Sequence, residues 1–211
     1  MHERAADHGI KISKEQLALF DVYLCELIEW NSRMNLTGIA ERGRMISELF
    51  LDSCIPVPYL PVTGRMLDVG SGAGFPAIVI KVLLPDIKLI LVEANSKKTS
   101  FLKQIIRLLR LDDIEVINGR IERIGDRLRP NGFDIISARA LADLKQIINW
   151  CSPLLSKEGM LVYFSGSKVD EGLTNCEYLM EDQNLTLAES IPYTLPGRRD
   201  YRNIVILKKE R

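Results

Sequence analysis

Residues 66–76 read Met-Leu-Asp-Val-Gly-Ser-Gly-Ala-Gly-Phe-Pro, and this stretch decides the fold class. Its apolar start predicts a buried strand that gives way at once to glycines at alternate positions: Gly70, Gly72 and Gly74. Proline is favoured in a first helical turn, so a helix can begin near Pro76. Glycine lets the backbone approach a ligand closely, and a helix N-terminus offers free N–H groups. Together these features predict a cradle for a nucleotide-type cofactor.

The type of cofactor follows from the residues around the glycines. Glu93 ends the next expected strand, 23 residues after Gly70, where a carboxylate that binds ribose hydroxyls is expected. The spacing is G-x-G-x-G, and Phe75 occupies the third glycine position of the dinucleotide pattern G-x-G-x-x-G. Phe75-Pro76 would crowd a pyrophosphate, and the acidic Asp68 suits a cationic ligand. The stretch therefore favours S-adenosylmethionine, with a dinucleotide or a ligand-free turn as alternatives. The candidate contacts are Gly70, Gly72, Gly74, Phe75 and Glu93.

Composition narrows the class of protein. The chain has 211 residues, 46% of them hydrophobic, and a formal net charge of zero, so overall charge gives no indication of a nucleic-acid partner. It contains no apolar run long enough to cross a membrane and no apolar N-terminal signal segment. The four cysteines form no C-x-x-C pair, which predicts cytoplasmic thiols rather than a metal site. Both histidines lie within the first eight residues, which argues against histidine-based catalysis.

The hydrophobic pattern predicts two parts. Residues 1–60 form a helical N-terminal extension, with a capping box of Ser13 and Gln16, a helix break at 35–38 and a second helix over 45–51. Residues 61–211 alternate strands and helices, which is typical of an α/β domain with a parallel sheet. The expected strands are 65–69, 88–93, 115–118, 133–137 and 159–164, and the expected helices are 76–84, 97–109, 121–128 and 141–155. A hairpin of 186–193 and 203–207 completes a mostly parallel seven-stranded sheet.

Several short segments of the chain resemble those of a known family. The matching segments include Asn-Leu-Thr at 35–37, Phe-Leu-Asp-Ser at 50–53, residues 67–76, Phe-Leu-Lys at 101–103, Arg-Ile-Glu at 120–122, Ser-Ala-Arg-Ala at 137–140 and Arg-Asn-Ile-Val at 202–205. They are similar to those of RsmG, or glucose-inhibited division protein B, the ribosomal small-subunit RNA guanine-N7 methyltransferases. The resemblance implies a class I S-adenosylmethionine-dependent methyltransferase domain over 61–211, with 16S ribosomal RNA or the small ribosomal subunit as its partner.

The resemblance also implies further site residues. The cofactor's adenine is expected beside Ile121 and Glu122, and Arg139 near the cofactor, where it could orient the acceptor base. Two positions depart from the family pattern. Leu49 stands where the family has histidine, and Ser165 stands where it has lysine.

The motifs of other methyl-transfer chemistries are missing. The fourth strand is not followed by the Pro-Pro motif used for exocyclic amines, and no cysteine follows a proline as a C5 nucleophile would. Guanine N7 carries a free lone pair and no proton, so its methylation needs alignment rather than a general base. We therefore expect no acid–base residue, and Arg139 in a positioning role.

Two local clusters of basic side chains indicate RNA binding. Residues 97–110 carry five basic side chains and no acid, and residues 196–211 carry six against two. Such clusters neutralise phosphates, although each could also be a solvated surface. The candidate RNA-binding residues are Asn35, Lys97, Arg198, Arg199, Tyr201 and Arg202. The rival classes are a nicotinamide-dependent oxidoreductase, a small-molecule methyltransferase and a non-catalytic RNA-binding module.

Overall fold

The structure, a computed structural model, describes residues 5–128, 132–166 and 169–210; Arg211, the last charge of the C-terminal basic segment, lies outside them. Seven strands form one sheet in the order β3-β2-β1-β4-β5-β7-β6. Strands β1 to β5 pair in parallel, and β7 runs antiparallel to both its neighbours. The predicted mostly parallel seven-stranded sheet is confirmed. The strands are β1 (Gly64–Val69), β2 (Ile87–Glu93), β3 (Ile114–Asn118), β4 (Phe133–Arg139), β5 (Leu155–Ser165), β6 (Leu185–Tyr193) and β7 (Arg202–Lys209).

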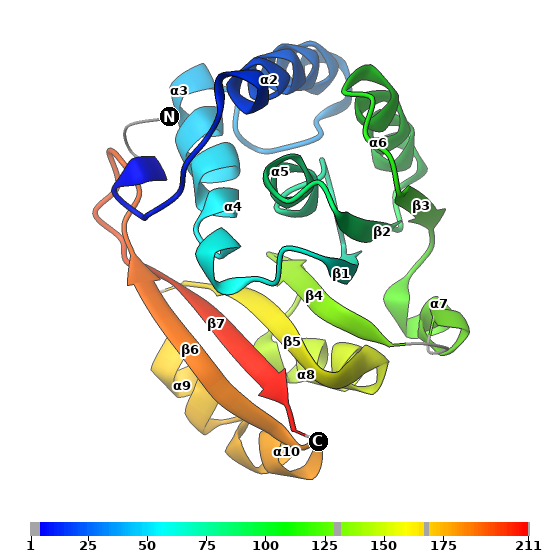
Figure 1. The fold of residues 1–211 in the computed structure, drawn as a ribbon, viewed down its shortest axis with the longest axis vertical. Coiled ribbons are helices and arrows are strands. Elements are labelled where there is room, and N and C mark those ends of the chain that lie inside the picture. The colour runs from blue at the N-terminus through cyan, green and yellow to red at the C-terminus, as the bar shows by residue number, and fades with distance from the viewer. Residues whose placement is uncertain (1–4, 129–131, 167–168, 211) are drawn as a thin grey trace.

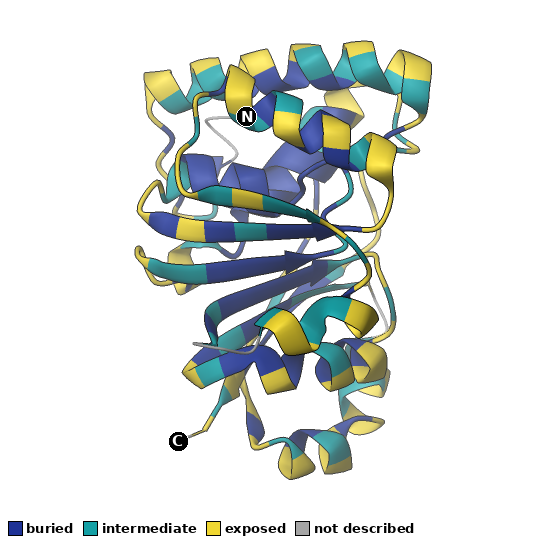
Figure 2. Ribbon diagram, turned by 90° about the vertical axis from the view of Figure 1, so that its right-hand side faces the viewer, coloured by how far each residue is buried: buried dark blue, intermediate teal, exposed yellow. Residues whose placement is uncertain are grey.

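Helices cover both faces of the sheet (Figure 1). On one face lie α5 (Ala77–Leu83) and α6 (Ser96–Leu108) together with the N-terminal helices. On the other lie α8 (Leu144–Cys151) and α10 (Glu177–Asp182), with α7 (Ile121–Leu128) packed beside α8. Figure 2 shows the strands mostly buried between these two helical layers.

The N-terminal extension begins with the long helix α2 (Lys14–Met34). The expected capping box is present, since Ser13 and Gln16 exchange side-chain to backbone hydrogen bonds, and Asn35 ends the helix in a left-handed conformation. The second helical stretch is longer than expected. It runs through α3 (Arg42–Met45), the π-helical segment η1 (Ile46–Leu51) and α4 (Asp52–Cys54).

The extension and the sheet share one hydrophobic core. Phe20, Tyr23 and Phe50 of the extension belong to the same buried cluster as Ile78 of α5 and Leu89 of β2. Helix α2 therefore packs over α5 and α6, whereas α4 lies beside α5 (Figure 1). The boundary near residue 60 stays a prediction.

Some expected elements differ in extent. The helix expected over 141–155 is shorter, because Asp143 caps α8 by accepting the Gln146 N–H at 2.8 Å and Pro153 enters a 3-10 turn after it. Helices α9 (Val169–Thr174) and α10 were not predicted, since both are short and mostly polar. Within the described ranges, no helix is long and apolar enough to span a membrane.

Candidate active site

The glycine loop lies at the carboxyl edge of the sheet. Val69, the last residue of β1, pairs with Val92 of β2 and Ala138 of β4. Directly after it, the N–H groups of Gly70 and Ser71 both donate to the Val92 carbonyl, at 2.9 and 3.1 Å. The three glycines have φ values of 72°, 57° and 92°, in the left-handed region that only glycine adopts without steric cost. The loop therefore folds back over the end of β2.

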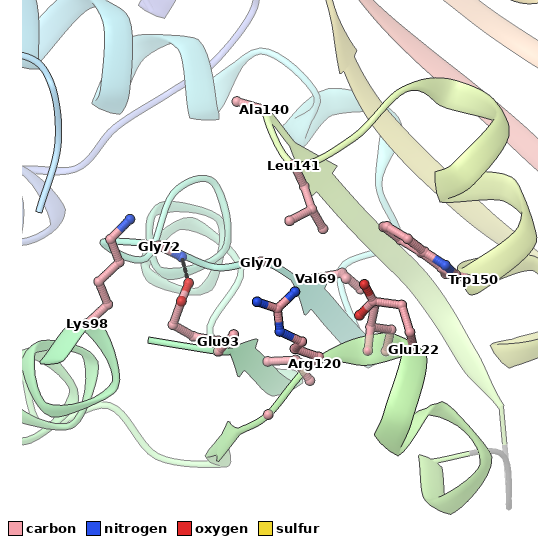
Figure 3. A pocket seen from close by; sticks show the side chains of 14 residues that line it. Val69, Gly70, Gly72, Glu93, Lys98, Arg120, Glu122, Ala140, Leu141 and Trp150 are labelled. Atoms are coloured by element: carbon pink, nitrogen blue, oxygen red, sulfur yellow. Dashed lines mark hydrogen bonds between the residues drawn. The ribbon is translucent and has the colours of Figure 1, made fainter. Parts of the chain in front are cut away.

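Glu93, at the end of β2, is bound to this loop. Its Oε2 accepts the Gly72 N–H at 2.7 Å (Figure 3). Its Oε1 accepts the Asn95 N–H at 2.7 Å. An ionised carboxylate has about four lone-pair sites. Each oxygen of Glu93 therefore keeps an acceptor site for a further hydrogen bond. A vicinal diol such as that of a ribose could supply two such donors.

A cavity of about 250 Å³ lies in front of Glu93 and the loop. It brings together five of the predicted cofactor contacts: Gly70, Gly72, Glu93, Ile121 and Glu122. Figure 3 shows the side chains of Leu141 and Trp150 across the cavity from Arg120 and Glu122. Sequence reasoning did not assign four further lining residues to the cofactor site. They come from α6, from the turns after β3 and β4 and from α8: Lys98, Arg120, Leu141 and Trp150.

Gly74 and Phe75, predicted as cofactor contacts, do not line this cavity. A Cβ on Gly74 would lie 2.5 Å from the Tyr23 hydroxyl and 2.6 Å from Ile78 Cδ1. Phe75 is buried and stacks on Tyr23 with ring centroids 5.1 Å apart. In this structure both residues pack against the N-terminal extension through Tyr23, and their assignment as cofactor contacts stays a prediction.

Asp68 is also buried rather than part of the cavity lining. Its Oδ1 accepts the Ser137 hydroxyl, and its Oδ2 has no hydrogen-bond partner among the described residues. Burial raises the pKa of this carboxyl from 3.8 to about 6. The acidic side chain of Asp68 would suit a cationic ligand, but its burial leaves it without direct access to the cavity.

We expect this burial to appear in the pH dependence of stability. The folded-state pKa of Asp68 is higher than its ordinary value, so the folded chain binds the proton more tightly. The unfolding free energy of the wild type, relative to Asp68→Asn, should be highest below about pH 4, fall by roughly 3 kcal/mol between about pH 4 and 6, and stay level above pH 6. Urea unfolding of both proteins between pH 4 and 7.5 measures this difference. Parallel pH profiles would contradict the assignment.

A second cavity, of about 500 Å³, adjoins the first. Ala140, directly after β4, lines both cavities. Arg139 lines the second cavity rather than the first, so its predicted contact with the cofactor stays a prediction. The lining also includes Phe164, Tyr201 and Arg202. Ser165, one of the two departures from the family pattern, lies here as well, whereas the other, Leu49, is buried in the extension.

Two buried carboxylates of the π-helical segment and α4 hold the arginines of this second cavity. Asp52 accepts the Tyr193 hydroxyl at 2.7 Å and Arg202 Nη1 at 2.9 Å, and its Oδ2 lies 3.3 Å from Arg139 Nε. Glu48 pairs with Arg44 at 2.7 Å, with Arg202 at 3.5 Å and with Arg198 at 3.6 Å.

These pairings have clear effects on protonation. The hydrogen bond from Arg44 is the main cause that lowers the pKa of Glu48, and burial raises the pKa of Tyr193. Sequence reasoning did not assign roles to Glu48, Asp52 or Tyr193, although Asp52 belongs to the quoted Phe-Leu-Asp-Ser segment.

The predicted RNA-binding residues are divided among several surfaces. Tyr201 and Arg202 line the second cavity, and Arg198 joins its ion pairs, while Arg199 is exposed on the same β6–β7 turn. The exposed residues Asn35, at the end of α2, and Lys97, in the first turn of α6, line neither cavity. In Figure 1, α6 and the β6–β7 turn lie on opposite sides of the molecule.

The basic segment 196–211 is not a single patch, because strand β7 separates its two halves. Figure 1 shows β7 running from the turn to the far end of the sheet, so Lys208 and Lys209 lie away from the second cavity. Lys209 donates to the Ser152 carbonyl at 2.8 Å. Among the described residues of this segment, those that line a cavity with Arg139 lie at the β6–β7 turn.

The strand order, the antiparallel β7, the glycine loop and the acidic end of β2 define the class I methyltransferase fold. Two solved structures share it. A precorrin-6y methyltransferase from Geobacter metallireducens covers 75% of this chain and 87% of its own length, with a TM-score of 0.56 and 17% identity. M. jannaschii TYW2, solved in complex with AdoMet, covers 76% and 74%, with a TM-score of 0.60 and 13% identity.

The chain belongs to the family described as rRNA small subunit methyltransferase G, whose family model matches residues 16–199. The ribosomal RNA small subunit methyltransferase G of Syntrophus aciditrophicus is 36% identical over 210 residues, which cover 98% of this chain and 87% of that protein. The resemblance noted in the sequence is confirmed.

Proposed function

We propose that this chain transfers a methyl group from S-adenosylmethionine to N7 of a guanine in small-subunit ribosomal RNA. The main support is that the two cavities are adjacent, since Ala140 lines both. A cofactor in the first cavity and a base in the second would therefore meet at one point. Family membership supports the nature of the substrate.

The first cavity fits S-adenosylmethionine, which supplies an electrophilic methyl group on a sulfonium. Glu93 has free acceptor sites for the ribose hydroxyls, and Ile121 and Glu122 line the part of the cavity after β3. At Gly72 an added Cβ would meet no atom closer than 3.9 Å, so the backbone there is open to a ligand. No phosphate-binding clearance is needed for this cofactor, in contrast to a dinucleotide.

The second cavity can orient a base but offers no free general base. The three carboxylates of its lining, Glu48, Asp52 and Asp200, are all paired with arginines. Burial keeps the Tyr193 hydroxyl protonated because it raises its pKa. No histidine or cysteine of the described residues lines either cavity. Guanine N7 has a lone pair and no proton, so this lining is sufficient for it. Arg139 and Arg202 can donate to guanine O6 or to phosphate, and Tyr201 can stack on an unpaired base.

Product analysis tests the proposal. The wild-type protein, S-adenosylmethionine with a labelled methyl group, and either free small-subunit RNA or the small subunit are incubated, and the nucleosides are separated by mass spectrometry. We expect the label in 7-methylguanosine. Label in another nucleoside would overturn the N7 assignment. Calorimetry with S-adenosylhomocysteine and with NAD separates the methyltransferase from the oxidoreductase alternative.

We expect RNA binding to depend on the β6–β7 turn rather than on the far end of β7. Arg199→Ala should weaken RNA binding and lower the salt slope of the binding constant by about 1, because one phosphate contact is lost. Lys208→Ala is the matched control, an exposed basic residue of the same sequence segment at the other end of the strand. Equal effects of the two substitutions on RNA affinity would argue against a specific role for the turn.

A further inference from the structure

Tyr23 connects the N-terminal extension to the cofactor loop. It lies on α2, is fully buried, and its hydroxyl donates to the Ala73 carbonyl in the middle of the glycine loop. The ring stacks face to face on Phe75, with centroids 5.1 Å apart and planes at 5°, and contacts Phe50 edge-on at 5.1 Å. A single side chain of the extension thus contacts the loop through both a polar and an aromatic interaction.

The loop has two functional sides. Gly70 and Gly72 line the cofactor cavity, and Gly72 donates to Glu93. Ala73, Gly74 and Phe75 face Tyr23, and the Tyr23 hydroxyl occupies the space that a Cβ on Gly74 would need. Gly74 N–H donates to Ser71 O at 2.7 Å, so the two sides are joined within one tight turn. A change at Tyr23 therefore reaches the Gly72 amide within a single residue of backbone.

We propose that Tyr23 is a positioning residue for methyl transfer, whose hydroxyl holds the glycine loop in the conformation that binds the cofactor. The inference rests on the proposed use of the first cavity for S-adenosylmethionine. It assigns a role in cofactor binding to the helical extension, which has no residue in the cavity lining. Without the hydroxyl, the buried Ala73 carbonyl loses its partner, and the loop must move to satisfy it.

Tyr23→Phe tests the proposal, because it removes one oxygen and keeps the aromatic packing. We expect the dissociation constant for S-adenosylhomocysteine, measured by calorimetry, to rise about three- to tenfold. With saturating cofactor, the turnover rate on RNA should return close to that of the wild type. Amide hydrogen exchange of residues 70–75 should be faster than in the wild type.

Phe20→Leu is the matched control. Phe20 is buried on the same helix and contacts Phe50 at 5.7 Å, so its substitution loosens the same cluster. It should lower the melting temperature and leave the affinity for S-adenosylhomocysteine within twofold. Wild-type affinity in Tyr23→Phe, or an equal loss in both variants, would overturn the role of Tyr23. If the wild type itself fails to bind S-adenosylhomocysteine, the proposed function is wrong. Unchanged amide hydrogen exchange of residues 70–75 in Tyr23→Phe would overturn the role of Tyr23 alone.

Discussion

Gly72→Asn should abolish measurable binding of S-adenosylhomocysteine while the protein stays folded. Gly72 has φ of 57°, and a Cβ there meets only the Gly70 carbonyl oxygen, at 3.9 Å. Asparagine tolerates this left-handed conformation better than most residues, so the strain is small. Its side chain would enter space beside Glu93 that we assign to the cofactor. We expect calorimetry to show at least a hundredfold weaker binding, with a melting temperature within a few degrees of the wild type.

Gly74→Ala is the matched control at the other side of the loop. Its new Cβ would lie 2.5 Å from the Tyr23 hydroxyl and 2.6 Å from Ile78 Cδ1, in addition to a φ of 92°. Overpacking of this kind costs about 1–3 kcal/mol, and the left-handed backbone adds about 1–2 kcal/mol. We therefore expect a loss of stability. The dissociation constant for S-adenosylhomocysteine should rise no more than in Tyr23→Phe, because the new Cβ displaces the same hydroxyl, and far less than in Gly72→Asn. Undiminished affinity in Gly72→Asn would remove the first cavity as the cofactor site.

Arg139→Ala should reduce the single-turnover rate of RNA methylation by about a hundredfold, the typical cost of a base misplaced by about 1 Å. The physical reason is that Arg139 lies in the second cavity, where Asp52 holds its Nε at 3.3 Å and the Glu48 carbonyl accepts its Nη2 at 2.5 Å. These two contacts fix the orientation of the Arg139 guanidinium. The affinity for S-adenosylhomocysteine should stay within about twofold, because Arg139 does not line the first cavity.

Arg44→Ala serves as the control for Arg139→Ala. Arg44 belongs to the same ion-pair network through Glu48, but its side chain is half exposed and does not line the second cavity. Its removal should change the methylation rate much less than that of Arg139. If cofactor affinity in Arg139→Ala fell as far as the rate, the arginine would belong to the cofactor site, as the sequence first suggested.

The structural features that the sequence predicted depend on patterns within short segments of the chain. A buried strand, alternating glycines and Glu93 one strand later needed only spacing and backbone chemistry, and the structure places Gly70, Gly72 and Glu93 on one cavity. The capping box at Ser13 is likewise a local pattern and is confirmed. The sheet followed from regular alternation of strands and helices.

The parts that sequence reasoning missed depend on contacts between distant segments. Phe75 was assigned to the cofactor because it is adjacent to Gly74, but Tyr23 and Phe50 bury it. Trp150 lines the cavity because α8 folds across the sheet, and no motif marks it. The ion pairs of Asp52 join residues up to 150 positions apart, so spacing could not predict them.

The basic residues of 196–211 were grouped together by sequence, but the structure separates them. It is continuous in sequence, and β7 then separates Arg199 from Lys208 by the length of a strand. Residues that are close in sequence lie far apart when a strand joins them, since a strand rises about 3.3 Å per residue.

Replacement of the target guanine by 7-deazaguanine in the RNA tests whether the methyl group is transferred to N7. The substitution removes the N7 lone pair and leaves O6 and the Watson–Crick edge for Arg139 and its neighbours to bind. We expect the modified RNA to bind the protein with nearly the affinity of the unmodified RNA and to take up no methyl label. Methyl uptake by the 7-deazaguanine RNA would contradict transfer to N7.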